Sequence, residues 1–225
     1  IVSDYQVGRD MWASLKADME SKGIAITGID FTPIGTKDYA ILLDKAMKSG
    51  ADGLALIVVG GDTVTSLKQG GEVGLAGKMK VMGTMLMDET QGQAVGANAA
   101  LGVHSTLRYH FTQDTPRNKR FVAAYKAKYG ELPSQYAGEA YDGLSWWLDV
   151  VESTGVWDKE KWVDAFKTSV RNDSVEGAKR MRACDNQAEQ VGLFGTAVAG
   201  GAGQPSVTMK VTETFTAQDL FKACN

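Results

Sequence analysis

The fold class is decided by residues 54–75, which read LALIVVGGDTVTSLKQGGEVGL. An apolar run ends at Gly60-Gly61-Asp62, and a helical pattern follows at once from Thr63. Such a run, without polar alternation, predicts a strand over 53–59 that is covered on both faces. A strand that leads through a glycine turn into a helix is how many α/β proteins build the edge of a ligand site.

The same alternation extends through the first hundred residues. Apolar residues at helical spacing predict helices over 8–22, 37–48, 63–73 and, more briefly, 94–99. Short β-branched or apolar runs predict strands over 24–30, 53–59, 80–84 and 102–107. Alternating strands and helices predict an α/β fold with a doubly wound parallel sheet. Ligands bind at the carboxyl ends of such strands, which here are 4–8, 60–63, 84–88 and 108–110.

The pattern changes after Tyr109. Three helices are predicted in succession, over 115–129, from about 133 to 151, and over 158–168, before strand-like pieces at 179–183, 192–199 and 206–211. Helices without intervening strands cannot continue the first sheet, so we expect them to cover a second sheet that this sequence largely lacks. The chain also opens on Ile1-Val2, which resembles the end of a buried strand. We therefore expect that an N-terminal portion is missing, with a processed mature protein as the alternative.

Composition excludes several partners. The chain has 225 residues, enough for one large domain or two small ones. Its 24 Lys and Arg against 27 Asp and Glu give a net charge of -3, which leaves no electrostatic footprint for nucleic acid. No apolar run approaches the roughly 20 residues needed to span a bilayer, so direct membrane insertion is not expected.

The glycine turn does not match a nucleotide site. A dinucleotide fingerprint needs G-x-G-x-x-G and a P-loop needs Gly-Lys-Ser/Thr, and neither occurs here. Asp62 would also repel a phosphate. Two roles remain open for Asp62: it is the N-cap of a helix that starts at Thr63, or it accepts a hydrogen bond from a ligand. The adjacent helix N-terminus could receive a ligand carboxylate.

Residues for catalysis are few. His104 and His110 flank one predicted strand and fit packing or surface positions better than catalysis. There is no G-x-S-x-G, C-x-x-C or H-E-x-x-H motif, so we expect no enzyme, no metal and no cofactor. The two cysteines, Cys184 and Cys224, fit either a disulfide or two free thiols. Tyr136, just after a helix start, fits either a cleft or the core.

Six segments carry a family resemblance. Residues 33–56, PIGTKDYAILLDKAMKSGADGLAL, resemble the P-x-G-T-x-D-[FY] pattern of bacterial solute-binding proteins of the branched-chain amino acid type, which serve ABC transporters. The other matches, in the same order along the chain, are DYQVGRD (4–10), VVGGD (58–62), LKQGGEVGL (67–75), DTPRNKRFVAAYKAKYGELPSQYAGEAYDG (114–143) and RACDNQ (182–187). The resemblance covers nearly the whole chain.

The resemblance implies the type I periplasmic-binding fold, with two α/β lobes, a ligand cleft between them and three crossover strands. Residues 1–108 and 191–225 would form the second, C-terminal lobe. Residues 109–190 would be the returning part of the first lobe, whose remainder would lie in the missing N-terminal portion.

The resemblance also implies ligand contacts, carried over to Val7, Gly61, Asp62, Met85, Tyr136 and Tyr109. Two positions depart from the family. Val7 stands where an aromatic residue is frequent, and Met85 stands where a carboxylate can bind the ligand's ammonium group. A standard α-amino acid therefore lacks its expected partner unless Asp62 takes over that role. Branched-chain amino acids, amides, and aliphatic or aromatic carboxylates all remain open.

The resemblance implies the following function. The protein would bind a small amphiphilic solute between two lobes and deliver it to an ABC transporter permease, without chemistry or a cofactor. It would work in the periplasm or another extracytoplasmic space, which favours a Cys184–Cys224 disulfide. A ligand-sensing receptor or regulatory module of the same fold is the alternative, followed by a small α/β enzyme.

Overall fold

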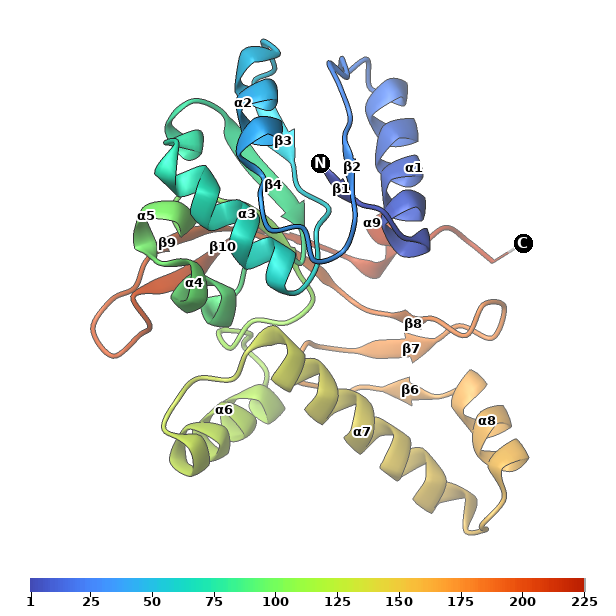
Figure 1. Cartoon of the computed structure of the whole chain (residues 1–225). Helices are drawn as coiled ribbons and strands as arrows, with labels where there is room; N and C mark the ends of the chain where they lie inside the picture. Colours follow the sequence, from blue (N-terminus) through green and yellow to red (C-terminus); the bar gives the residue numbers. More distant parts are fainter. Residues whose placement is uncertain (225) are drawn as a thin grey trace. The chain divides into compact units, whose positions relative to one another are not determined.

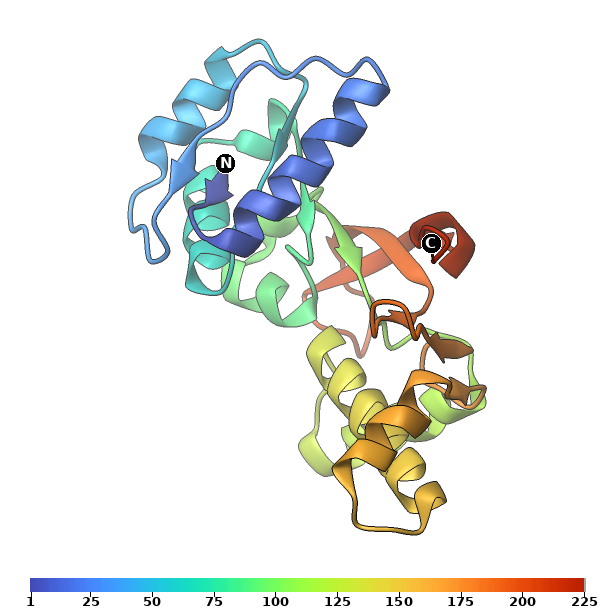
Figure 2. The ribbon, with the colours of Figure 1, turned by 90° about the vertical axis from the view of Figure 1, so that its right-hand side faces the viewer.

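The computed structural model describes residues 1–224 (Figure 1; turned by 90° in Figure 2). The chain forms two compact units, and it passes between them three times. Unit 1 comprises residues 1–106 and 194–212, and unit 2 comprises residues 107–193 and 213–225.

Unit 1 is built on a sheet with the strand order β10-β9-β5-β4-β3. Strands β3 (Gly53–Ala55), β4 (Lys80–Thr84) and β5 (His104–Leu107) run parallel. Two longer strands, β9 (Gly192–Ala199) and β10 (Val207–Phe215), complete it. A parallel pair, β1 (Val2–Ser3) and β2 (Phe31–Thr32), adjoins the β3 side through a bridge between Val2 and Ile57.

Helices cover this sheet. They are α1 (Gln6–Ser21), α2 (Ala40–Lys48), α3 (Gly61–Glu72), α4 (Glu89–Val95) and α5 (Ala97–Ala100), with a single 3-10 turn at Leu75–Gly77. Figure 1 shows α3, α4 and α5 packed beside one another, while α1 lies against β1. Apolar side chains from strands, helices and the residues that follow β3 and β4 are fully buried in unit 1, among them Leu43, Leu56, Leu67, Val81, Leu86 and Met87.

The prediction of an α/β fold with a doubly wound parallel sheet is confirmed. The predicted strand over 24–30 is wrong, because its neighbour β1 has only two residues and offers backbone partners to Asp30 and Thr32 alone. The strand predicted over 53–59 is shorter, as β3 ends at Ala55 and Ile57 then bonds to the backbone of Ile1 and Ser3. Strand β4 has the predicted bounds.

Unit 2 consists of helices and a small antiparallel sheet. The helices are α6 (Pro116–Tyr129), α7 (Gln135–Thr154), α8 (Lys159–Lys167) and α9 (Ala217–Leu220). The sheet has the order β6 (Val170–Arg171), β7 (Lys179–Met181) and β8 (Ala188–Glu189). The sequence signalled the helix ends well, since Thr115 and Ser134 cap α6 and α7 and Gly130 ends α6 in a left-handed conformation.

A buried charge network ties α7 to this sheet. The carboxylate of Asp142 is fully buried and lies 3.2 Å from Arg171 Nε and 3.0 Å from Lys179 Nζ. It also accepts a hydrogen bond of 2.8 Å from the Ser174 hydroxyl. Burial alone would raise the pKa of Asp142, but Lys179, Ser174 and Arg171 outweigh it, and the pKa lies below its usual value. The network therefore holds Asp142 ionised and fixes the helix to the sheet.

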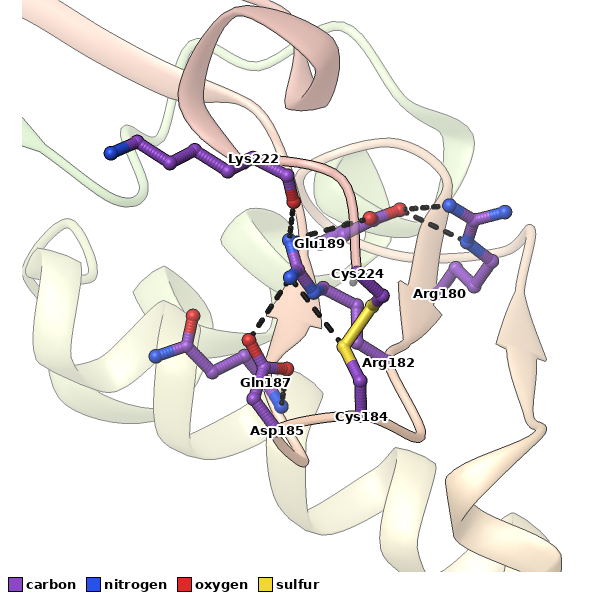
Figure 3. Close-up of a disulfide and its surroundings, with 8 residues drawn as sticks. All are labelled: Arg180, Arg182, Cys184, Asp185, Gln187, Glu189, Lys222 and Cys224. Atoms are coloured by element: carbon purple, nitrogen blue, oxygen red, sulfur yellow. Dashed lines mark hydrogen bonds and ion pairs between the residues drawn. A yellow bond between two sulfur atoms is a disulfide. The ribbon is translucent and has the colours of Figure 1, made fainter.

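The predicted disulfide between Cys184 and Cys224 is present (Figure 3). Arg182 lies beside it, and its guanidinium donates to the Lys222 carbonyl at 2.7 Å and pairs with Asp185 at 3.1 Å. Both the disulfide and Arg182 therefore hold the last residues of the chain against the turn between β7 and β8.

Among residues 1–224, no helix is both long enough and apolar enough to cross a membrane.

Candidate functional site

The candidate site is the edge of unit 1 at which parallel strands end. Strands β1, β3 and β4 run in the same direction, so their carboxyl ends share one edge of the sheet. The chain leaves this edge through the start of α1, through the Gly60-Gly61 turn, and through Met85. This edge is where a doubly wound sheet places its ligands.

The glycine turn leaves the start of α3 uncovered. Gly60 has φ +58°, a conformation that side chains other than glycine rarely adopt. Gly61 has no such restriction, yet a Cβ atom added there would meet no other atom within 4 Å. Neither backbone geometry nor packing thus requires a glycine at position 61, and the space beside this first helical residue is open.

Asp62 is an anchor for a neighbouring loop. The prediction that it caps the helix is wrong, because α3 already begins at Gly61 and its cap position is Gly60. The side chain is only 4% exposed, and both of its oxygens accept the Gly35 N–H, at 3.1 and 2.9 Å. Gln69, two turns further along α3, accepts the Tyr39 N–H at 2.6 Å. The helix thereby fixes the 33–39 segment.

Buried Tyr39 lies in the field of this carboxylate. Its pKa is raised, first by burial and then by the negative charge of Asp62, while the hydroxyls of Thr32 and Thr36 oppose the increase. Asp62 therefore has a demonstrable role in the fold, and its role as a ligand contact stays a prediction.

Met85 occupies a strained position directly after β4. Its φ is +52°, and Asn186 is the other non-glycine residue with a positive φ among residues 1–224. The Met85 N–H is held by Thr106 on β5, through the carbonyl at 3.2 Å and the hydroxyl at 3.1 Å. The next two residues, Leu86 and Met87, are fully buried, whereas Met85 itself is only partly buried. Sequence reasoning missed Thr106, because its partner is 21 positions away on another strand.

Val7 also lies at this edge, in the first turn of α1, and it is 52% exposed. The turn before it is tight: a Cβ atom on Gly8 would lie 2.2 Å from the Ser3 carbonyl oxygen. Gly8 therefore allows α1 to start directly on β1. Together, the structure places Val7, Gly61, Asp62 and Met85 after parallel strands of unit 1 that run in the same direction.

The two predicted residues of unit 2 differ in exposure. Tyr136, the second residue of α7, is 51% exposed. Tyr109 is 1% exposed, its hydroxyl donates to Asn118 at 2.7 Å, and its ring fills the space beside Gly138. Tyr109 thus contributes to the core of unit 2. The roles of both tyrosines in ligand binding stay predictions.

The two histidines make structural contacts. His104 Nδ1 lies 2.9 Å from the Thr196 hydroxyl, and its ring stacks on Phe194 with the ring centres 5.8 Å apart. His110 is buried, with Nδ1 2.6 Å from the Thr112 hydroxyl. These contacts fit the packing interpretation of both residues.

One apolar cavity of about 130 Å³ lies elsewhere in unit 1. Its walls include Trp12 and Met19 of α1 together with Ala51 and Met79, which precede β3 and β4. The cavity therefore adjoins the amino ends of these strands. We do not assign the ligand to it, since doubly wound sheets bind ligands at the opposite ends.

The fold and this edge define a class of α/β proteins that bind ligands beside the carboxyl ends of parallel strands. Within that class, a family model described as periplasmic binding protein matches residues 1–202. The chain belongs to the periplasmic binding protein family.

Individual relatives agree with this assignment. A Leu/Ile/Val-binding protein homolog from Brucella melitensis is 32% identical over 174 residues, which are 74% of this chain and 44% of that protein. The chain thus spans less than half of this curated relative.

Solved structures show the same fold. An amino acid ABC transporter substrate-binding protein from Pseudomonas fluorescens Pf-5 superimposes with a TM-score of 0.87 at 22% identity, over 96% of this chain and 58% of that chain. An ABC transporter solute-binding protein from Rhodopseudomonas palustris BisB5, in complex with 3,4-dihydroxybenzoic acid, has a TM-score of 0.85 at 26% identity, over 96% and 59%.

Proposed function

We propose that the protein containing this chain is an extracytoplasmic solute-binding protein that binds a small amphiphilic solute and delivers it to an ABC permease. The observation that carries this proposal is the open edge of unit 1, where the Gly60-Gly61 turn leaves the start of α3 uncovered. A helix N-terminus beside open space suits a carboxylate or amide oxygen. The Cys184–Cys224 disulfide fits an oxidising compartment.

The ligand class is taken from the site and from the relatives together. One relative is described as a homolog of a Leu/Ile/Val-binding protein, and one similar structure holds 3,4-dihydroxybenzoic acid. Both support a small molecule with a carboxylate and an apolar body, such as an amino acid, an amide or an aromatic acid. We assign no turnover and no cofactor to the protein.

We further propose that the two units belong to different lobes of the whole protein. Unit 1 would belong to the second lobe, and unit 2 would be the returning part of the first. Exposed apolar side chains on α7, namely Leu144, Trp147 and Leu148, support this, because such a face is suited to packing against further structure. The disulfide ties residues 213–224 to unit 2.

The proposal is tested by a thermal-shift screen of the full-length protein with amino acids, amides, and aliphatic and aromatic acids. A ligand at 100 times its dissociation constant stabilises the folded state by about 2.7 kcal/mol. Calorimetry then gives the affinity of the best compound. If no compound in the panel raises the melting temperature, the protein is not a binding protein for this class of solute.

A pair of valine variants locates the site. Gly61→Val fills the open space at the start of α3 and should weaken binding of the best compound at least tenfold. Gly77→Val is the control, because a side chain there also meets open space but lies in the 3-10 turn before β4, away from the edge. Equal affinities in the two variants would remove the start of α3 from the site.

A further inference from the structure

We propose that Met85 determines specificity, so that unit 1 selects ligands without an ammonium group at its edge. The inference rests on the function proposed above and names the ligand class more narrowly: a carboxylic acid or amide with an apolar or aromatic body, rather than an α-amino acid. Two observations support it: the carboxylates at this edge already accept hydrogen bonds within unit 1, and the backbone of Met85 is fixed by hydrogen bonds to Thr106.

Four acidic residues follow the ends of β1, β3 and β4, and each is already engaged within unit 1. Three are buried, namely Asp62, Asp88 and Glu89. Asp62 accepts the Gly35 N–H. Asp88 caps α4, where it accepts the N–H groups of Thr90 and Gln91 at 2.9 and 3.0 Å. A ligand ammonium that approached one of these two carboxylates would compete with the N–H groups that hold a loop or the start of a helix.

The other two carboxylates are occupied as well. Glu89 accepts the Thr208 hydroxyl at 3.0 Å and the Met209 N–H at 2.9 Å, which fixes α4 to β10. Asp4 is the exposed member, and its Oδ1 pairs with the Arg9 guanidinium through Nε at 2.7 Å and a terminal nitrogen at 2.6 Å. Asp38, which follows β2, likewise accepts the Ala40 N–H at 2.9 Å. An ammonium group that loses its water at this edge would therefore meet carboxylates that are already engaged by other donors. Leaving such a cation unpaired is costly.

Met85 supplies the opposite chemistry. Its thioether side chain is apolar and polarizable, and it favours aliphatic and aromatic neighbours. The Met85 N–H donates two hydrogen bonds to Thr106, which hold the backbone in its left-handed conformation. The next residue, Leu86, is fully buried and anchors the chain on the other side of Met85. Partly buried Met85 thus follows β4 on a fixed backbone, and its apolar side chain suits contact with the uncharged part of a ligand.

The test uses matched compounds that differ only in the ammonium group. Calorimetry on the full-length protein compares leucine with 4-methylpentanoate, and phenylalanine with 3-phenylpropanoate. We expect the acid without the amine to bind at least tenfold more tightly in each pair that binds. The opposite order in the wild-type protein would overturn the inference.

Two variants assign the preference to this side chain. Met85→Asp introduces a carboxylate, and Met85→Asn has the same size without the charge; Asp and Asn both tolerate the left-handed conformation. We expect Met85→Asp to shift the ratio of affinities at least tenfold towards the amino acids and Met85→Asn to leave them disfavoured, with both folded by circular dichroism and urea unfolding. Equal ratios in the two variants would show that Met85 does not set the preference.

The two proposals fail in different ways. Binding of amino acids in preference to their amine-free counterparts would reject the role of Met85 while leaving a solute-binding protein. Absence of binding by every compound in these pairs and in the wider screen would reject the binding function, and the inference with it.

Discussion

We predict that unit 2 loses stability as the pH rises from about 5 to about 8, because of one buried carboxyl group. Glu176 is 3% exposed, and its Oε2 lies 2.5 Å from Lys179 Nζ. Lys179 also pairs with ionised Asp142 at 3.0 Å, so its charge is shared between two acids. Burial raises the pKa of Glu176 to about 8, Glu139 adds to the increase, and Lys179 opposes it.

The sign follows from proton binding in the two states. An unfolded glutamate releases its proton near its ordinary pKa of 4.5, whereas the folded state holds the proton until about pH 8. Between these values the folded state binds more protons, so the free energy of unfolding falls as the pH rises. At about 1.4 kcal/mol for each pH unit, the loss is at most about 5 kcal/mol.

Neighbouring groups act outside this window. The lowered pKa of Asp142 places its contribution at more acidic pH, where stability is lost as the pH falls. The pKa of Lys179 is also raised, since Glu176 and Asp142 outweigh the effect of burial, so its contribution is lost only in strongly alkaline solution. Glu176 is therefore the group of this network that titrates between pH 5 and 8.

The assay is urea unfolding followed by tryptophan fluorescence at several pH values. Trp12 lies in unit 1 and the other four tryptophans lie in unit 2, so the signal reports mainly on unit 2. Glu176→Gln keeps the shape of the side chain without an ionisable group. We expect the pH dependence to flatten in this variant, which should become a few kcal/mol more stable than the wild type near pH 8.

The control is Glu152→Gln, which removes an exposed carboxylate from the same unit. This variant should keep the wild-type pH dependence. A wild-type protein that is more stable near pH 8 than near pH 5, or a Glu176→Gln variant with the wild-type slope, would refute the reasoning.

Three further predictions concern stability, and each is measured by urea unfolding. Replacing both Cys184 and Cys224 by serine should lower the free energy of unfolding by roughly 4 kcal/mol, because the disulfide closes a loop of 40 residues; no loss would mean that the bridge does not form in solution. Gly60→Ala should cost about 1–2 kcal/mol because of the positive φ, whereas Gly61→Ala should change stability by less than about 0.5 kcal/mol; similar losses would contradict the open turn. Asp62→Ala should cost about 1–3 kcal/mol, since the loop N–H loses a charged acceptor; an unchanged midpoint would exclude the anchor.

The sequence predicted the α/β alternation and most helices, because periodicity, caps and glycine stops are local signals. Gly130 and Ser134 marked helix ends that the structure confirms. The prediction of strands failed where strand pairing is non-local. The length of β2 depends on the length of β1, and the two-residue strands β6 and β8 form only against β7. Such strands are too short to leave a periodic pattern.

In the candidate site, too, local features could be predicted from the sequence and non-local contacts could not. Gly60-Gly61 could be placed at a strand end from the sequence, since the apolar run and the turn are contiguous. The engagement of Asp62 could not, because Gly35 lies 27 positions away in a loop. The left-handed backbone of Met85 was equally hidden, since methionine gives no hint of a positive φ.

The engagement of Asp62 changes which experiment can decide the ligand class. An Asp62 variant that loses affinity would be ambiguous, because the same change releases the 33–39 loop from α3 and alters the edge without any ligand contact. Met85 is free of this difficulty: its backbone N–H, not its side chain, makes the hydrogen bonds to Thr106. Substitutions that tolerate a positive φ therefore preserve those bonds and vary the side chain alone. A change in ligand preference at position 85 can then be attributed to chemistry at the edge rather than to a displaced loop.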